Sequence, residues 1–228
     1  MHENDTVSDI DFSEANEPLR PLAEIFEPDP RHRHITLEQW YEAIDRARIS
    51  PAAPKDVKQM FENARIAAVY TYFAYRAHHG FQLLAYGALE EALRLKYDLM
   101  AHELPVRKPR TLEEFMSLAL AQGWITNQGY RSHYDLAFHR AQMKLLYRDL
   151  ESGSDAYGIR VVREPTHQEV IAELDEMNLA PSKLQAGRKI RNILAHGSSA
   201  TWPGALATLD TVAEEINQLF PFPVPSKD

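Results

Sequence analysis

The sequence predicts an all-α fold, a helical bundle of about seven helices, and three observations lead to this prediction. Apolar residues recur at steps of three and four over long stretches, as in Phe73, Ala77 and Phe81, which is the spacing of one helix face. Three stretches open with the Thr-x-x-Glu/Gln pattern of a capping box. The only strand-like segment, "GIRVVREP" at residues 158–165, is too short and isolated to build a sheet.

The first two predicted helices cover residues 36–47 and 55–101. The first opens at Thr36, whose partner Gln39 completes a capping box, and the prolines at 51 and 54 end it. Residues 55–101 keep their apolar phase throughout and are predicted to form one long helix. A bend at His79–Gly80 stays open as an alternative, because glycine lowers helix stability.

The third and fourth predicted helices cover residues 111–122 and 129–151. Thr111 and Glu114 give the third a capping box, and Gly123 is placed to end it in the left-handed conformation. The fourth is expected to turn four apolar side chains toward the core: Leu136, Met143, Leu146 and Leu150.

The last three predicted helices fill the C-terminal third of the chain. Thr166 and Glu169 open the fifth, which ends near residue 178. The sixth begins at Pro181, since proline suits the first turn, and it ends near residue 196. The seventh begins near Trp202–Pro203 and is expected to bury five side chains: Leu206, Leu209, Ala213, Ile216 and Leu219.

Charge divides the chain into an arm and a body. Residues 1–29 hold nine acidic residues and one basic residue, Arg20, so they carry the whole formal charge of −8. Residues 1–35 are therefore predicted to form an acidic disordered arm, residues 36–221 the helical domain, and residues 222–228 an extended proline-rich tail. Because the body is neutral, the acidic balance does not exclude a nucleic acid as its partner.

Composition excludes several kinds of chemistry. The chain has no cysteine, which removes disulfides, thiolate zinc sites and thiol nucleophiles. It shows neither the order of a signal peptide nor a long apolar run, so a soluble, cytoplasmic protein without a membrane partner is expected. The histidines, such as His78–His79 and His133, stand at no recognised metal-ligand spacing, and we expect no metal and no cofactor.

The stretch "RKIRNILAHGSS", residues 188–199, concentrates the polar chemistry of the chain. Arg191 and His196 are five residues apart, which on a helix means about 7.5 Å of rise and about 140° of rotation. The two side chains therefore do not stack on one face. A long arginine can still curl back, but a site is more easily built if two copies of the helix face each other across a two-fold axis. The geometry predicts a homodimer, with the helices at residues 55–101 and 182–196 as its interface.

The residue types of this motif suit cleavage of a phosphodiester. Histidine moves protons near neutral pH, and the planar guanidinium of arginine matches a phosphate. Asn192, directly after Arg191, can orient either group. Together the three side chains could cleave RNA through its own 2′-hydroxyl without a metal ion. The alternative interpretation is a helix C-terminus at which basic groups favour the dipole.

The motif resembles that of the HEPN superfamily (higher eukaryotes and prokaryotes nucleotide-binding domains), in which four to six residues separate an Arg, often followed by a polar residue, from a His. The segment "GALEEALRLKY", residues 87–97, is similar to an upstream amphipathic helix of that family. The resemblance implies a dimeric endoribonuclease of stress or phage defence that leaves a 2′,3′-cyclic phosphate. It implies that His196 is the acid or base, that Arg191 holds the phosphate and that Asn192 positions them. A second formal match, Arg160 to His167, passes through a proline and is discarded.

Neighbouring residues extend the predicted site. Arg188, Lys189 and Ser198 are predicted to bind RNA, and the basic run at residues 107–110 would form a phosphate track if it met them. Toxin members of the family that pair with nucleotidyltransferase antitoxins carry a tyrosine where Ser198 stands. The resemblance therefore implies an antitoxin or other defence-system partner, but puts an antitoxin of the nucleotidyltransferase type in doubt. Glu90 could orient Arg191 across the bundle, but a pair with Arg94 on the same helix is the preferred interpretation.

Two other function classes stay open. A catalytically silent HEPN-like module would bind a nucleotide or a partner protein in a larger assembly and need not keep the full Arg-Asn-His set. A purely structural helical adaptor would not bind RNA at all. The acidic arm is expected to be a solubilising tail, with coverage of a basic cleft as the alternative.

Overall fold

The computed structural model describes residues 19–104, 107–151, 163–196 and 204–223. Within these ranges the chain forms eight α-helices, four short 3-10 helices and no strand, which confirms the predicted all-α class. The α-helices are α1 (Leu37–Asp45), α2 (Lys55–Tyr70), α3 (His78–Met100), α4 (Leu112–Ala121), α5 (Arg131–Glu151), α6 (His167–Met177), α7 (Ala180–Ala195) and α8 (Ala207–Leu219), and the 3-10 helices are η1 (Leu22–Glu24), η2 (Pro30–His32), η3 (Tyr75–Ala77) and η4 (Asn127–Gly129).

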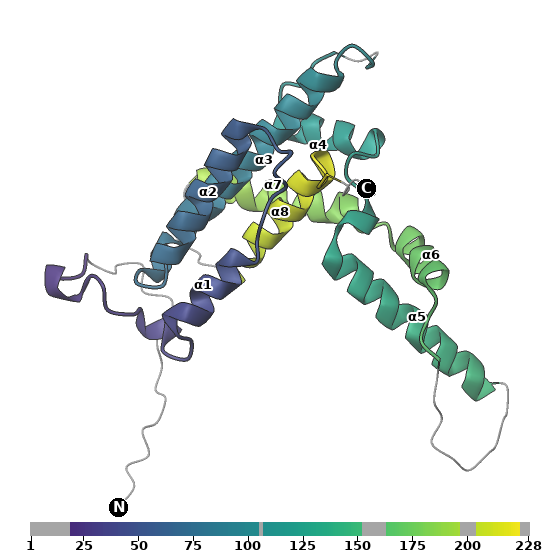
Figure 1. Cartoon of the computed structure of the whole chain (residues 1–228), viewed down its shortest axis with the longest axis horizontal. Coiled ribbons are helices and arrows are strands. Elements are labelled where there is room, and N and C mark those ends of the chain that lie inside the picture. Colours follow the sequence, from purple (N-terminus) through teal and green to yellow (C-terminus); the bar gives the residue numbers. More distant parts are fainter. Residues whose placement is uncertain (1–18, 105–106, 152–162, 197–203, 224–228) are drawn as a thin grey trace, which may run out of the picture.

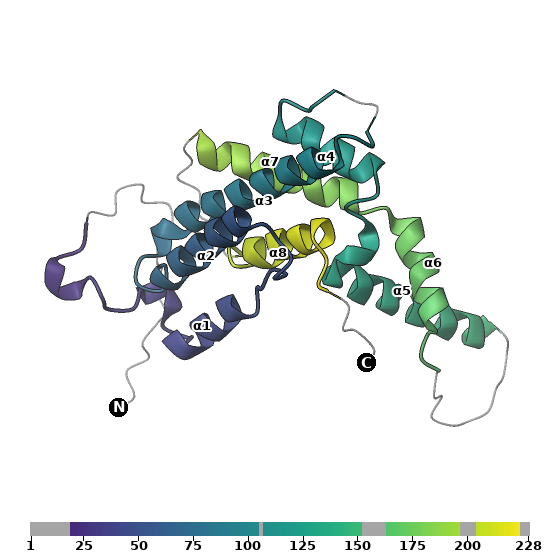
Figure 2. The same cartoon turned by 45° about the horizontal axis from the view of Figure 1, so that its top comes forward.

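The molecule has a body and two projections. Helices α2, α3, α7 and α8 pack together in the body, while α5 and α6 form a two-helix arm at one end (Figure 1). The N-terminal segment that contains η1 lies at the opposite end, and the second view shows the same arrangement (Figure 2). None of the described helices combines the length and the apolar character that crossing a membrane requires.

Local sequence signals set most helix ends. Thr36 with Gln39 and Thr166 with Glu169 form the predicted capping boxes, in which each pair exchanges two hydrogen bonds. At α4 the hydroxyl of Thr111 accepts from the Glu114 backbone, but the Glu114 carboxylate accepts from the backbone of Arg110 instead. Gly123 follows α4 with φ +65°, as predicted for a glycine that ends a helix.

The long helix predicted over residues 55–101 is in fact two helices, α2 and α3, and this prediction was wrong. The break lies between Thr71 and Ala77, not at His79–Gly80. Its cause is tertiary: the buried carboxylate of Asp29 accepts a hydrogen bond from the Tyr75 backbone, and the Asp29 backbone donates to the carbonyl of Tyr72. A segment distant in sequence thus satisfies the backbone groups that the break exposes.

Asp29 also shows that part of the predicted acidic arm packs on the body. Residues 19–35 contain η1 and η2, and both Asp29 and His32 are buried. The His32 ring lies between Trp40 and Tyr72, at centroid distances of 4.5 and 5.7 Å. Residues 1–18, the tail beyond residue 223 and most of the strand-like segment lie outside the described residues.

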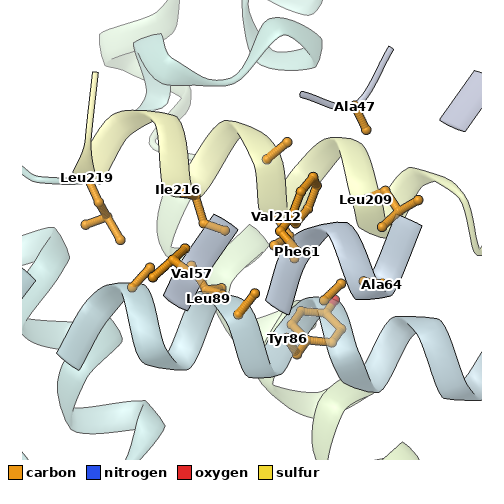
Figure 3. Packing of buried hydrophobic residues seen from close by; sticks show 14 of the residues in the cluster. Ala47, Val57, Phe61, Ala64, Tyr86, Leu89, Leu209, Val212, Ile216 and Leu219 are labelled. Atoms are coloured by element: carbon orange, nitrogen blue, oxygen red, sulfur yellow. The ribbon is translucent and has the colours of Figure 1, made fainter. Parts of the chain in front are cut away.

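The main core lies between α2, α3 and α8. Figure 3 shows Phe61 of α2, Leu89 of α3 and Ile216 of α8 among the side chains that fill this space, and all three are fully buried. Alanines on α2 and α3 are also fully buried, so the two helices approach closely. The predicted core face of the last helix is confirmed for Leu209, Ala213, Ile216 and Leu219, and Leu206 is partly buried.

The arm has a separate small core, made by Ala137 and Ala141 of α5 with Val170 and Leu174 of α6. The prediction that Leu136, Met143 and Leu150 face the core was wrong, because all three are exposed and Leu146 is only partly buried. The reason is that α5 packs against α6 with the opposite face, on which small residues allow close contact. An apolar stripe is therefore left on the surface of α5.

Candidate functional site

Helix α7 carries the predicted motif, and its position depends on a glycine. A Cβ added to Gly187 would lie 3.2 Å from Cε1 of Tyr86 on α3, so a side chain at this position would crowd the Tyr86 ring. Ala180, Leu184 and Gly187 form the buried face of α7. Arg191 follows one turn later on the same face, which directs it toward α3.

Arg191 meets Glu90 of α3. Its Nη2 lies 2.8 Å from Oε2 of Glu90, and both side chains are partly exposed. Its Nη1 also donates to Oδ1 of Asn192 over 3.4 Å. The preferred interpretation of Glu90 as a partner of Arg94 was wrong, because Arg94 pairs with Glu91. The structure thus brings three of the predicted site residues together and holds Arg191 from another helix.

His196 lies on the other side of α7. It is the residue after the last helical turn, its backbone donates to the carbonyl of Asn192, and its side chain is exposed. Among the described residues no hydrogen bond joins its ring to Arg191, Asn192 or Glu90. The outer face of α7 exposes Lys189, Asn192, Ile193 and His196 together.

The two basic clusters lie around α4. Arg188 forms an ion pair with Glu113 of α4. Arg107 and Lys108 line one open pocket beside this helix, Arg188 lines the next, and Glu113 belongs to both pockets. The two clusters therefore border neighbouring pockets with the carboxylate of Glu113 between them, and the phosphate track stays a prediction. Ser198 lies outside the described residues.

A second polar cluster escaped the sequence analysis. Tyr130 donates a 2.9 Å hydrogen bond to Glu215 of α8, and both side chains are buried. Burial raises the pKa of Glu215 to about 7 and also raises the pKa of Tyr130. Nζ of Lys183 lies 4.4 Å from the centre of the Tyr130 ring and 3.6 Å from the Glu214 carboxylate.

This cluster lies beside a polar cleft of about 490 Å³. Lys183, Asp210 and Glu214 line it, and burial raises the pKa of both carboxyl groups. The signal that could have revealed the cluster is Glu215 itself, a charged residue on the apolar face of the last predicted helix.

No metal site accompanies either cluster in the described part of the chain, where no group of three or more His, Cys, Asp or Glu side chains could hold an ion. Comparison of the chain with protein-family models, with curated proteins and with solved structures finds no match.

Proposed function

We propose that this chain is a metal-independent endoribonuclease of the HEPN type that works as a homodimer. The observation that carries the proposal is the ion pair of Arg191 with Glu90, beside a helix end that exposes Asn192 and His196. A carboxylate on a neighbouring helix fixes the orientation of the guanidinium, as productive binding of a phosphate requires. The stress or phage defence role rests on the resemblance of the motif alone.

In the proposed reaction the 2′-hydroxyl of the RNA attacks the adjacent phosphorus. The 2′-O–P bond forms and the P–O5′ bond breaks, which leaves a 2′,3′-cyclic phosphate on one fragment and a 5′-hydroxyl on the other. His196 of one protomer takes the proton of the 2′-hydroxyl, and a protonated His196 from its partner gives a proton to the leaving oxygen. Arg191 binds the phosphate and stabilises its developing negative charge.

A second copy would supply what one chain lacks. Arg191 points back to α3, whereas His196 lies on the outer face of α7, as the five-residue spacing requires. Ile193, which is 55% exposed, places an apolar side chain in the middle of that outer face. Apolar contact around Ile193 of two copies would bring both His196 side chains to one cleft, which the long Arg191 side chains would reach from the other side of α7. Lys189 on the same face would meet the RNA backbone, with Arg188 beside it.

The test is cleavage of an end-labelled structured RNA in EDTA by the wild type, Arg191→Ala and His196→Ala. We expect the wild type to produce cyclic-phosphate ends and each variant to lose at least a hundredfold in rate, about the contribution of a general acid or base. Arg94→Ala is the matched control, because it removes an arginine that is also paired with a glutamate but lies outside the motif. Loss of cleavage in EDTA, or unchanged cleavage in both motif variants, would contradict the proposal.

The silent binding module is the second candidate, and one observation favours it. Arg188 and Arg191 are both neutralised by glutamates of neighbouring helices before any RNA arrives. Equal inactivity of the wild type and both variants, with folding and dimerisation intact, would support this candidate, and its partner would then be the antitoxin, defence protein or nucleotide to identify. An adaptor would be supported instead by the absence of RNA binding at low salt.

A further inference from the structure

The N-terminal segment exposes an apolar motif with an acidic edge. Leu19, Leu22 and Phe26 are 91%, 84% and 73% exposed, and they lie in and on either side of the short 3-10 helix η1. Arg20, the one base nearby, is paired with Asp29, which leaves Glu24 and Glu27 as the charges beside the motif. The edge of the Phe26 ring contacts Phe73, which holds the segment against the end of α2.

The outer face of α5 exposes an apolar stripe with a basic edge. Its members are 44% to 58% exposed and recur over four turns: Leu136, Met143, Tyr147 and Leu150. Arg140, Lys144 and Arg148 run along one edge of the stripe at steps of four residues. Arg140 and Lys144 share carboxylates of α6, while Arg148 forms no ion pair with any described residue.

The motif and the stripe of one molecule cannot meet. Both views place the segment with η1 at one end of the molecule and the α5–α6 arm at the other (Figures 1 and 2). Each surface is apolar, and their edges carry opposite charges, so each is complementary to the other on a second molecule. The segment holds one short 3-10 helix, Leu22–Glu24, and the stripe from Leu136 to Leu150 is about 21 Å long, which leaves room for it.

We propose that the apolar segment Leu19–Phe26 of one molecule docks on the Leu136–Leu150 stripe of a second copy of this chain. Leu22 and Phe26 lie against Met143 and Tyr147, and Glu24 and Glu27 face the basic edge of α5. The contact is distinct from the outer face of α7, so it does not depend on the proposed ribonuclease activity. It links the N-terminal end of one protomer to the two-helix arm of another.

The absence of cysteine allows a direct test in the full-length chain. Phe26→Cys and Met143→Cys proteins are mixed under oxidising conditions, and disulfide-linked pairs are counted over time. Tyr41→Cys replaces Met143→Cys in the control, because Tyr41 is an equally exposed side chain on α1. We expect the Phe26–Met143 pair to form at least tenfold faster than the Phe26–Tyr41 pair. Equal rates would overturn the proposal.

Sedimentation equilibrium provides the second measurement. Leu22→Asp/Phe26→Asp and Met143→Asp/Leu150→Asp should each weaken self-association by about tenfold or more, because central apolar anchors dominate such contacts. A mixture of the two variants keeps one intact motif and one intact stripe, so it should associate more tightly than either variant alone. All substituted side chains are exposed, and unchanged melting temperatures will show that the variants fold. Association equal to that of the wild type in both variants would also overturn the proposal.

Discussion

The Tyr130 hydroxyl lies 2.9 Å from Oε1 of Glu215, so this buried pair joins the residue before α5 to α8, and Lys183 of α7 lies over the Tyr130 ring. A carboxyl group with a pKa near 7 in the folded chain and 4.5 as its ordinary value keeps its proton more tightly when the chain is folded. Between those two pH values the folded state therefore binds more protons than the unfolded state. The free energy of unfolding must fall as the pH rises through this window.

Glu215→Gln tests this pH dependence. The amide still accepts from Tyr130 but does not titrate, so the variant should lack this contribution to the slope. The free energy of unfolding of the wild type, taken relative to that of the variant, should decrease by about 2 kcal/mol between pH 5 and pH 8. Urea unfolding of both proteins at the two pH values measures this difference. The contributions of titrating groups that both proteins share cancel in the comparison; one such group is His78, whose pKa is lowered to about 4 by burial. A constant difference would contradict the assignment.

Gly187→Leu should disturb both stability and the site. The new side chain would meet the Tyr86 ring and force α7 away from α3, at a cost of about 1–3 kcal/mol. Gly80→Leu is the control, because a Cβ at Gly80 meets no atom within 4 Å. We expect thermal unfolding to show a clear loss for the first variant and little change for the second. Similar losses in both would show that the glycine is not needed for close packing.

Glu90→Gln should reduce turnover more than RNA affinity. In the proposed ribonuclease Glu90 would contact Arg191 and not the RNA, as a positioning residue, so its loss would leave the cation in place but less well oriented. We expect kcat to fall by about tenfold while KM changes little. Glu91→Gln, which removes the partner of Arg94, is the matched control. If KM rises and kcat is unchanged, Glu90 does not position Arg191 for catalysis.

Asp29→Asn should destabilise the junction between α2 and α3. The buried carboxylate accepts from the Arg31 and Tyr75 backbones and pairs with Arg20, and an amide cannot replace all of these contacts. The expected cost is about 1–3 kcal/mol. Chemical denaturation measures it, with the exposed Glu27→Gln as a control that should change little. An equal loss of stability in both variants would mean that the loss of a negative charge, and not the loss of the buried contacts, causes the destabilisation.

Most of the fold could be predicted because its signals are local. The threonine caps, Gly123 and the apolar face of α8 depend on residues within a few turns of one another, and the structure confirms them. The break before α3 could not be predicted, because the carboxylate that satisfies it comes from Asp29. The buried face of α5 was assigned incorrectly because α6 selects the face with alanines over the face with larger apolar residues.

The helix that carries the candidate site was predictable to a similar extent. Arg191 and His196 lie at the end of a helix with the geometry that their spacing predicts, since helix geometry depends only on the intervening residues. The partners Glu90 and Glu113 lie on other helices, and periodicity cannot choose between a partner on the same helix and one across the bundle. Their contribution becomes visible only when the helices are packed.

The thin core of the α5–α6 arm has a consequence for local unfolding. Only four apolar side chains of the arm's cluster, Ala137, Ala141, Val170 and Leu174, are buried, and the larger ones that pack on them are partly exposed, whereas α3 is surrounded by α2, α7 and α8. Segments with few buried apolar contacts open at lower free energy than the centre of a fold. Backbone amides of α6, and those of α5 that follow Ala137, should exchange with deuterium long before the amides of α3 around Leu89. The arm can thus separate its helices while the body that holds Arg191 stays folded.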